Sequence, residues 1–298
     1  MNRASRKAPP PSGKAPMPRP PLPLTLLKGA FLSPLKHPGT GHGNGGPRLR
    51  DRARATPGRA DAYRRVCGFA PTGEPPGDTL PLPYPHVLAF PLTTRLMAAR
   101  AFPLPLLGLV HTSIEVVRHR ALRPTDDLGL TAYVEKLAPH RRGTEATLTV
   151  EATVDGTIAW ESRSTYLARH ETGATAPPRQ GPGDEPPLPV EARWRLAAGL
   201  GRRYAAVSGD RNPIHLHPLT ARPFGFPRPI AHGMWTFARC LAEYGPTGTE
   251  PVRVTARFRA PVLLPATVTY GRRGQHFELR DSTGRPHVRG RVEPLGGR

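Results

Sequence analysis

The sequence is poor in cysteine and has no long apolar run. Its 298 residues include only Cys67 and Cys240, which excludes a disulfide framework and a cysteine metal cluster and favours a reducing cytoplasm. The most apolar stretch near the start, residues 22–33, is interrupted by prolines and by Lys28. Such a stretch is a poor signal-peptide core, and no run approaches the length of about 20 residues that spans a bilayer.

Lysine is also scarce, because five lysines stand against 38 arginines in a chain of formal net charge +21. A strongly basic chain suggests a nucleic-acid partner. Here the charge is spread thinly beyond about residue 65, and no recognition helix, zinc-finger spacing or aromatic RNA-binding motif occurs. We therefore expect no specific nucleic-acid partner.

Proline and glycine are abundant but unevenly placed. Residues 1–50 are basic and rich in both, so we expect a disordered tail there. Residues 171–189 have the composition of a linker. These two segments leave two compact units, residues 51–170 and 190–298.

The two units follow one plan of short helix, longer helix and strands. In the first unit we expect helices at 61–69 and 82–102 and strands at 111–122, 129–139, 145–154 and 157–169. In the second we expect a strand at 190–197, helices at 201–210 and 232–245, and strands at 252–262, 266–273, 275–281 and 285–293. The repeated order predicts a duplicated fold.

Residue matches support the repeat and show where its copies differ. Tyr63, Val66, Cys67 and Gly68 fall opposite Tyr204, Val207, Ser208 and Gly209, and Pro83 and His86 fall opposite Pro229 and His232. Phe69, however, stands where the second copy has Asp210. The gap from Gly68 to His86 is 18 residues, against 23 from Gly209 to His232. The first copy therefore lacks a polar insert that the second copy has.

That insert places an acid close to a base. Asp210 and His215 are five positions apart, with Asn212 and Pro213 between them. Pro213 fixes one backbone angle and biases Asn212 away from helix, so an irregular loop is expected. A carboxylate and an imidazole that converge on one water can activate it and move its proton. This is the chemistry of adding water to a double bond or removing it.

Gly233 begins the predicted helix at 232–245. A helix N-terminus offers free N–H groups and a partial positive charge, which can stabilise a carbonyl oxygen that gains negative charge. With a thioester carbonyl there, the adjacent Cα–H would become acidic enough for His215 to remove.

Each of these residues also has a plainer interpretation. An Asp before Asn-Pro commonly forms a turn, and a single His is commonly structural. His215 and His217 resemble a metal-binding pair, but no third ligand has suitable spacing. Ser208 could be read as a nucleophile, although no G-x-S-x-G motif surrounds it.

The whole string "YAAVSGDRNPIHLHPLTARPFGFPRPIAHGMW" (204–235) resembles the signature of MaoC-like dehydratases, the (R)-specific enoyl-CoA hydratases or hydratase 2 family. More weakly, "YRRVCGF" and residues 78–92 resemble the first half of two-domain members, the (3R)-hydroxyacyl-thioester dehydratases. His217 departs from the family pattern, which commonly has an acidic residue there.

The resemblance implies an α+β double hotdog fold, with a degenerate first half and a catalytic second half. It implies a catalytic pair at Asp210 and His215, a supporting Asn212 and an oxyanion donor at the Gly233 N–H. The implied substrate is an acyl thioester of coenzyme A or acyl carrier protein, with no metal or redox cofactor. We expect a pseudo-dimer within one chain that can form a homodimer. A non-catalytic acyl-thioester binder and a hotdog thioesterase are the alternatives.

Overall fold

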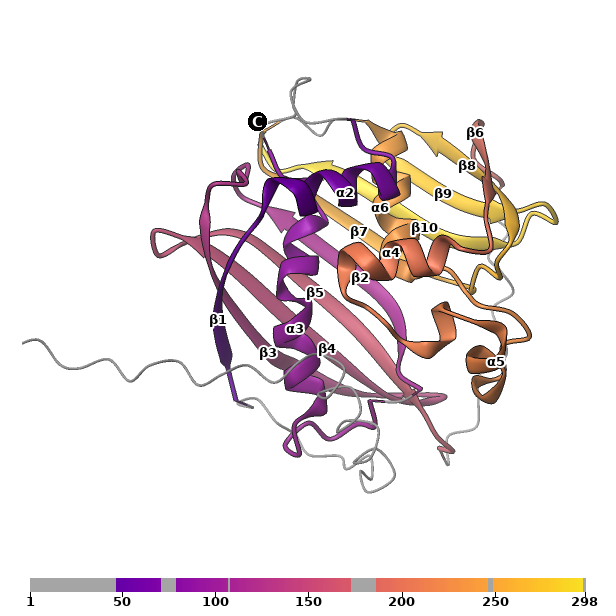
Figure 1. Cartoon of the computed structure of the whole chain (residues 1–298), viewed down its shortest axis with the longest axis horizontal. Helices are drawn as coiled ribbons and strands as arrows, with labels where there is room; N and C mark the ends of the chain where they lie inside the picture. Colours follow the sequence, from indigo (N-terminus) through magenta and orange to yellow (C-terminus); the bar gives the residue numbers. More distant parts are fainter. Residues whose placement is uncertain (1–46, 71–78, 107, 173–185, 246–248, 297–298) are drawn as a thin grey trace, which may run out of the picture.

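The computed structural model describes residues 47–70, 79–106, 108–172, 186–245 and 249–296. Most of the expected tail (1–46) and linker (173–185) lies outside the described residues. The strands form one antiparallel sheet of ten, in the order β1-β3-β4-β5-β2-β7-β10-β9-β8-β6 (Figure 1). Their bounds are β1 Leu49–Arg54, β2 Val110–Arg118, β3 Asp127–His140, β4 Gly143–Val154, β5 Thr157–Arg169, β6 Val190–Leu196, β7 Val252–Phe258, β8 Ala266–Arg273, β9 His276–Asp281 and β10 Pro286–Pro294.

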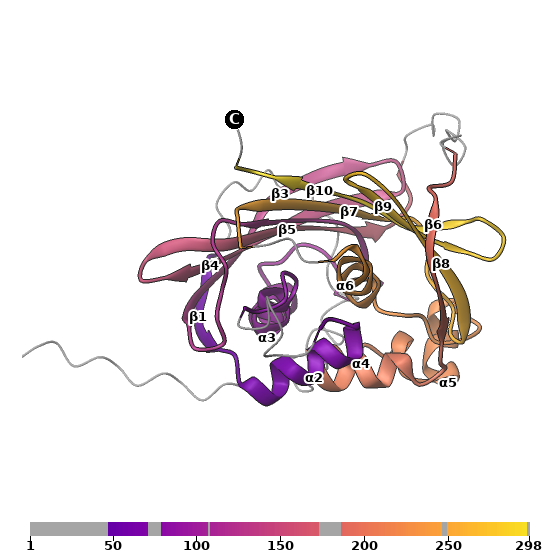
Figure 2. The same cartoon turned by 90° about the horizontal axis from the view of Figure 1, so that it is seen from above.

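The sheet curves around two helices, α3 (Tyr84–Ala98) and α6 (Gly233–Tyr244) (Figure 2). Two further helices, α2 (Pro57–Cys67) and α4 (Leu200–Ser208), cross beneath them and pack against each other. Each half thus wraps its own central helix in an antiparallel sheet, and the chain is a double hotdog of the α+β class. Among the described residues, no helix is both long and apolar enough to cross a membrane.

The two halves share the sheet through the pairing of β2 with β7. Ile114 pairs with Ala256 and Val116 pairs with Val254, in antiparallel register. All four side chains are buried, with exposed fractions of 2% or less. The junction is therefore an internal part of one core rather than a contact between two separate units.

Glycine ends the short helix of each half in the same way. Gly68 after α2 and Gly209 after α4 both adopt the left-handed conformation, with φ of 78° and 80°. Glycine reaches this region without the steric cost that a side chain brings. The matched glycines of the sequence repeat therefore mark matched chain reversals.

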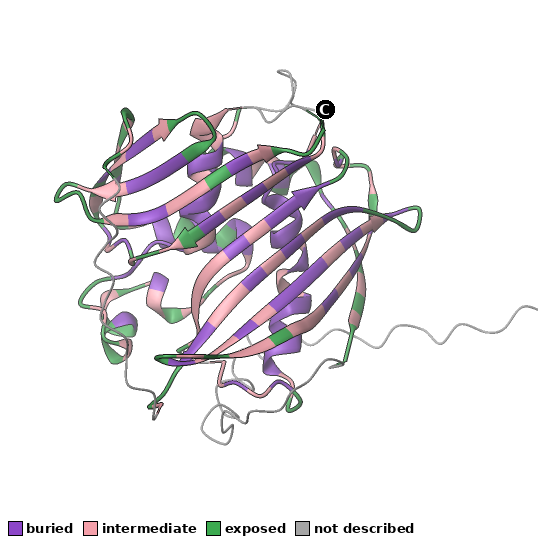
Figure 3. Cartoon of the chain, turned by 180° about the vertical axis from the view of Figure 1, so that it is seen from behind, coloured by how far each residue is buried: buried purple, intermediate pink, exposed green. Residues whose placement is uncertain are grey.

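The alternation predicted for residues 145–154 is confirmed. Its inward residues are all buried, with exposed fractions of 9% or less: Ala146, Leu148, Val150, Ala152 and Val154. Asp155 and Gly156 both have positive φ, 51° and 81°, as a tight hairpin turn requires. Seen from behind, the strands show buried residues alternating with part-buried ones (Figure 3).

Strand β1 was missed by the sequence analysis, which placed residues 49 and 50 in the tail. Leu49–Arg54 instead pairs with β3, from Leu49 opposite Ala132 to Arg54 opposite Asp127. Leu49, Asp51 and Ala53 are part-buried, whereas Arg50, Arg52 and Arg54 are exposed. Because arginine fills the outer face and Asp51 interrupts the inner one, this alternation was hidden by the basic composition.

Several predicted ends were also too long. The helix expected at 82–102 covers Tyr84–Ala98 and carries Pro91 inside it. The strands expected at 111–122 and 252–262 end at Arg118 and Phe258. The order and type of the predicted elements are otherwise confirmed for the described residues.

Candidate active site

The loop after α4 is built by side chains that bond to its own backbone. The Ser208 hydroxyl donates to the Tyr204 carbonyl at 2.9 Å and accepts from the Asp210 N–H at 3.2 Å. The Asp210 Oδ1 then accepts from the Asn212 N–H at 3.1 Å. Ser208 is buried, and these contacts position the loop, which opposes its interpretation as a nucleophile.

Asn212 and Pro213 start the short turn that carries His215. The Asn212 Oδ1 accepts from the Ile214 N–H at 3.4 Å, so Asn212 caps the 3-10 turn Pro213–His215. Pro213 occupies the first position of that turn, where its missing N–H costs nothing. The sequence-predicted support from Asn212 thus acts through the backbone.

The His215 ring is buried and its tautomer is fixed. His215 Nδ1 lies 2.8 Å from the Ile230 carbonyl oxygen. A carbonyl can only accept, so Nδ1 carries the hydrogen and Nε2 keeps a lone pair. Burial lowers the pKa of His215, although the nearby Asp210 carboxylate and the Ile230 carbonyl oppose the shift. The ring is therefore a neutral base at pH 7.

His232 joins the pair, and the sequence analysis did not assign it to the site. Its ring stacks on that of His215 with centroids 3.6 Å apart. Its Nε2 lies 3.0 Å from the Asp210 carbonyl oxygen and 3.9 Å from the Asp210 Oδ2. Burial and the neighbouring His215 lower the pKa of His232 to about 3. Two signals in the sequence were its match with His86 in the other repeat and its place in the string at 204–235.

Gly233 is the first residue of α6, so its N–H belongs to the helix end whose donors have no acceptor within the helix. An added Cβ at Gly233 would lie 3.3 Å from the Phe258 ring. The site therefore combines a carboxylate, a neutral imidazole and a helix N-terminus. One donor atom from each of Asp210, His215 and His232 lies within 4.8 Å of the others.

A carboxylate and two imidazoles also form a donor set that a zinc ion accepts. Two of the ring nitrogens, however, already have backbone partners, His215 Nδ1 with Ile230 and His232 Nε2 with Asp210. His217, the other residue of the metal pair considered from the sequence, is exposed. Its Nδ1 accepts from the Leu219 N–H at 3.2 Å and so caps the short helix α5 (Pro218–Ala221).

The double hotdog fold and the cluster of Asp210, His215 and His232 are the features by which this class of protein is recognised. Comparison with known proteins then identifies the family. The model of the MaoC-like domain matches residues 174–294. A 3-hydroxyacyl-thioester dehydratase X of Mycobacterium tuberculosis is 38% identical over 245 residues, which cover 80% of this chain and 86% of that protein. The chain therefore belongs to the MaoC-like dehydratase family.

Two solved structures agree with this fold. The crystal structure of HtdX from Mycobacterium tuberculosis matches with a TM-score of 0.72 and 33% identity, over 84% of this chain and 100% of that chain. A MaoC-like dehydratase from Phytophthora capsici matches with a TM-score of 0.66 and 19% identity, over 85% and 97% of the two chains. An (R)-specific enoyl-CoA hydratase of Aeromonas caviae is 34% identical over 90 residues, which cover 28% of this chain and 67% of that protein.

Gly201 in α4 lies directly against the loop that carries His215 and gives a first test. A Cβ at Gly201 would lie 1.9 Å from the His215 carbonyl oxygen, whereas a Cβ at Gly199 would meet only an Arg202 side-chain nitrogen at 3.5 Å. Gly201→Ala should therefore displace the His215 turn, lower the melting temperature by several degrees and reduce turnover. Gly199→Ala should leave both nearly unchanged. Equal behaviour of the two variants would contradict the close approach.

The buried histidines give a second test, through the pH dependence of stability. Burial lowers the pKa of His86 to about 4 and of His111 and His232 to about 3, and it also lowers the pKa values of His215 and His287. Unfolded histidines titrate near pH 6.5, so below that pH the unfolded state binds more protons and stability must fall. Each such histidine contributes up to about 1.4 kcal/mol per pH unit.

Urea unfolding between pH 6.5 and 5 should therefore show a free energy of unfolding that falls as the pH falls, with a slope that reaches about three to five protons near pH 5. Carboxylates contribute little in this window because their ordinary pKa values lie near 4. A flat profile from pH 6.5 to 5 would mean that the histidines are protonated in the folded protein.

Proposed function

We propose that this chain is a hydro-lyase that catalyses the reversible hydration of trans-2-enoyl thioesters to (3R)-hydroxyacyl thioesters, in fatty-acid or related acyl metabolism. The observation that carries the proposal is the approach of the Asp210 carboxylate and the His215 imidazole at the N-terminus of α6. The relative named 3-hydroxyacyl-thioester dehydratase X and the relative named (R)-specific enoyl-CoA hydratase support the reaction class.

In the dehydration direction, His215 Nε2 removes the proton from Cα of the hydroxyacyl thioester. The electron pair of the Cα–H bond forms the double bond as the C3–O bond breaks. Asp210, which begins this direction protonated, donates its proton to the departing hydroxyl, so that water leaves, Asp210 ends as the carboxylate and His215 ends as the imidazolium. Hydration reverses these steps, with Asp210 orienting the water and His215 returning a proton to Cα. A neutral His215 is the form that can begin dehydration, and the lowered pKa keeps it in that form.

The thioester oxygen gains negative charge while Cα is deprotonated. We assign its stabilisation to the Gly233 N–H and to the positive end of α6, since a preorganised donor acts most strongly in a buried site. Asn212 contributes by holding the turn that presents His215. These roles account for each of the four residues that the sequence singled out.

The central test compares the pair with a histidine just outside it. Asp210→Asn and His215→Ala should each lower kcat for crotonyl-CoA hydration by at least about 100-fold, the usual scale for a positioned acid or base. His217→Ala removes an exposed cap of α5 and should stay near the wild-type rate. Circular dichroism should show all three variants folded. Near-normal turnover in a folded Asp210 or His215 variant would rule out the assignment.

The products of the same assay separate the alternatives. Hydration removes the absorbance of the conjugated enoyl thioester and releases no free thiol, whereas a hotdog thioesterase would release the thiol. A non-catalytic acyl-thioester binder would change neither signal. Loss of absorbance without thiol release, together with (3R) product on chiral chromatography, is the result that we expect.

We further propose that the reaction needs no metal and no redox cofactor, since a carboxylate, an imidazole and a backbone N–H already supply every proton and charge contact that it requires. Dialysis against a chelator should leave kcat within about twofold of the untreated enzyme, with control protein handled identically. Activity that disappears on chelation and returns with Zn²⁺ would instead assign the cluster of Asp210, His215 and His232 to a metal.

An acidic carrier suits the basic surface. A cavity of about 410 Å³ lies between α2, α4, β6 and α6 and is lined by tryptophans and five arginines: Arg65, Arg193, Arg195, Arg203 and Arg239, with Trp194 and Trp235. Coenzyme A and acyl carrier protein both bring phosphate, so comparing kcat/KM for their thioesters identifies the carrier.

Cys67 and Cys240 are free and buried, which agrees with action in a reducing cytoplasm.

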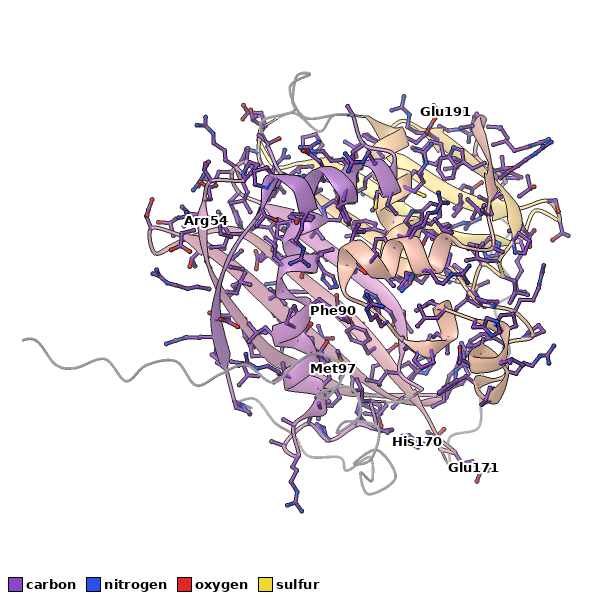
Figure 4. All side chains as sticks on the ribbon, viewed as in Figure 1. Arg54, Phe90, Met97, His170, Glu171 and Glu191 are labelled. Atoms are coloured by element: carbon purple, nitrogen blue, oxygen red, sulfur yellow. The ribbon has the colours of Figure 1, made fainter. Side chains whose placement is uncertain are left out.

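We propose that the first half holds the acyl chain. Phe90 is part-buried and lies four residues after His86, so both side chains share one face of α3. Figure 4 labels Phe90 and Met97 on this helix. Leu88 lies half a helical turn away, and its part-buried side chain packs against the hydrophobic core instead. The face that carries Phe90 is therefore the candidate wall of an acyl pocket.

A larger side chain on the Phe90 face of α3 should lower kcat/KM for substrates with long acyl chains. Phe90→Trp should lower kcat/KM for a C12 enoyl thioester far more than for C4, while Leu88→Trp should affect the two substrates equally. The wild type should favour C12 over C4. A wild type that prefers C4, or equal effects of Phe90→Trp on both substrates, would reduce the first half to a structural partner.

A further inference from the structure

The inner face of the first half is more polar than a core requires. Ser162 and Ser164 of β5 and Thr94 of α3 are buried, with exposed fractions of 3% or less. The hydroxyl oxygens of Ser162 and Thr94 have no hydrogen-bond partner among the described residues, whereas Ser164 interacts with the Tyr166 side chain. Buried hydroxyls nearly always have partners in folded proteins. Something outside the described residues, either water or ligand, must therefore satisfy this surface.

Two more buried polar side chains, both histidines, lie next to the cluster of Asp210, His215 and His232. His86 lies in the first turn of α3 with 6% of its surface exposed, and its Nδ1 is buried without a partner among the described residues. His111 lies on β2, and its Nε2 is buried and equally without a partner there. The two rings lie parallel with centroids 6.4 Å apart. Both nitrogens therefore belong to one small region between α3 and the sheet.

This region is continuous with the active site. The His111 ring stacks on Tyr166 at 4.5 Å and meets Phe258 at 4.8 Å between centroids. Phe258 is the ring that lies 3.3 Å from the Cβ position of Gly233. The Asp210 carboxylate is also close to both His86 and Tyr166. Burial lowers the pKa of His86 and the carboxylate raises it, whereas burial and the carboxylate both raise the pKa of Tyr166. A chain that leaves the reacting carbons and passes Phe258 reaches His111 next.

An unbranched hydrocarbon would be a poor occupant of this region. Displacing water from a buried nitrogen without replacing its hydrogen bond leaves that nitrogen unsatisfied and weakens binding. Two such nitrogens would penalise an entirely apolar chain twice. An oxygen on the chain would restore those bonds, so the surface selects for oxygenated acyl groups.

The charge state of the two histidine rings limits which oxygen-containing groups on the acyl chain they can bind. Burial lowers the pKa of His86 to about 4 and of His111 to about 3, so both imidazoles are neutral at pH 7. A neutral imidazole offers one donor and one acceptor. One ring nitrogen of His111 is used by a hydrogen bond with the Ser113 backbone, so the nitrogens left for a ligand are His111 Nε2 and His86 Nδ1, and between them they can match a hydroxyl or a carbonyl. A carboxylate on the chain would find no cation here and would be repelled by Asp210.

We propose that His86 and His111 form a polar subsite in the first half that binds a hydroxyl or carbonyl oxygen carried by the acyl chain of the thioester substrate. The proposal rests on the proposed function for the identity of the substrate. It differs from the acyl-pocket proposal, because it concerns the chemistry of the chain and not its length.

Binding of unreactive ligands tests the subsite without requiring turnover. The probes are saturated C12-CoA thioethers, either unsubstituted or carrying one hydroxyl at successive positions beyond C3, measured by titration calorimetry. We expect at least one hydroxylated probe to bind about tenfold more tightly than the unsubstituted one, which corresponds to about 1.4 kcal/mol. His111→Phe keeps a ring against Tyr166 and Phe258 and should abolish that preference.

His119→Phe is the matched control, because His119 follows β2 directly but is exposed and contacts Glu161. It should keep the wild-type preference. His86→Leu should have the same effect as His111→Phe. It takes the place of His111→Phe if the His111→Phe protein does not fold. The unsubstituted probe should bind all folded variants with affinity equal to or better than that of the wild type.

Three results would overturn the subsite: no hydroxyl position improves binding, no probe binds at all, or His111→Phe weakens the hydroxylated and unsubstituted probes equally. The first result would mean that ordered water alone satisfies the histidines. Hydration of an unsubstituted enoyl thioester by the wild type separately tests the proposed function. Turnover with no hydroxyl preference would therefore reject only the subsite.

Discussion

The pairing of β2 with β7 is the constraint on which the arrangement of the site depends. This single antiparallel ladder, from Ser113 opposite Arg257 to Arg118 opposite Val252, joins the strands of both halves into one sheet. It fixes α3 and α6 side by side beneath that sheet. The ladder also brings His111 of the first half against Phe258 of the second. Without it, the loop that carries Asp210 and His215 would not be held against the first half.

A second set of contacts fixes the helices under the sheet. The Trp235 indole N–H donates to the Val66 carbonyl at 2.9 Å, which ties α6 of one half to α2 of the other. The rings of Tyr63 and Tyr204, matched residues of the repeat, lie 6.1 Å apart. Both tyrosines are fully or almost fully buried. The same sequence match that revealed the duplication therefore forms part of the contact between its copies.

Much of the fold could be predicted because its signals are local. Glycines after α2 and α4 end those helices, and the alternation along Gly143–Val154 continues through a turn whose two residues both need positive φ. The approach of Asp210 to His215 was also predictable, since the loop between them spans only five positions. Such features depend on neighbours in the sequence.

What was missed depends on tertiary contacts. The strand Leu49–Arg54 is recognisable only through its pairing with β3, because arginine occupies its whole outer face. The place of His232 in the site follows from the stacking of its ring on His215, which is 17 positions away. Likewise, the functional meaning of His86 and His111 comes from two ring nitrogens left without described partners. Spacing along the chain contains none of this information.

The covalent joining of the two halves has an evolutionary consequence. In a symmetric dimer of identical chains, every substitution appears twice, so a change that reshapes the wall of one site also alters the catalytic residues of the other. Here Phe69 occupies the position that Asp210 has in the second half, while the shared ladder of β2 and β7 is kept. Each copy has thus become an independent target of selection. If the second copy carries the chemistry as proposed, substitutions in the first copy can change which substrates are accepted without altering Asp210 or His215.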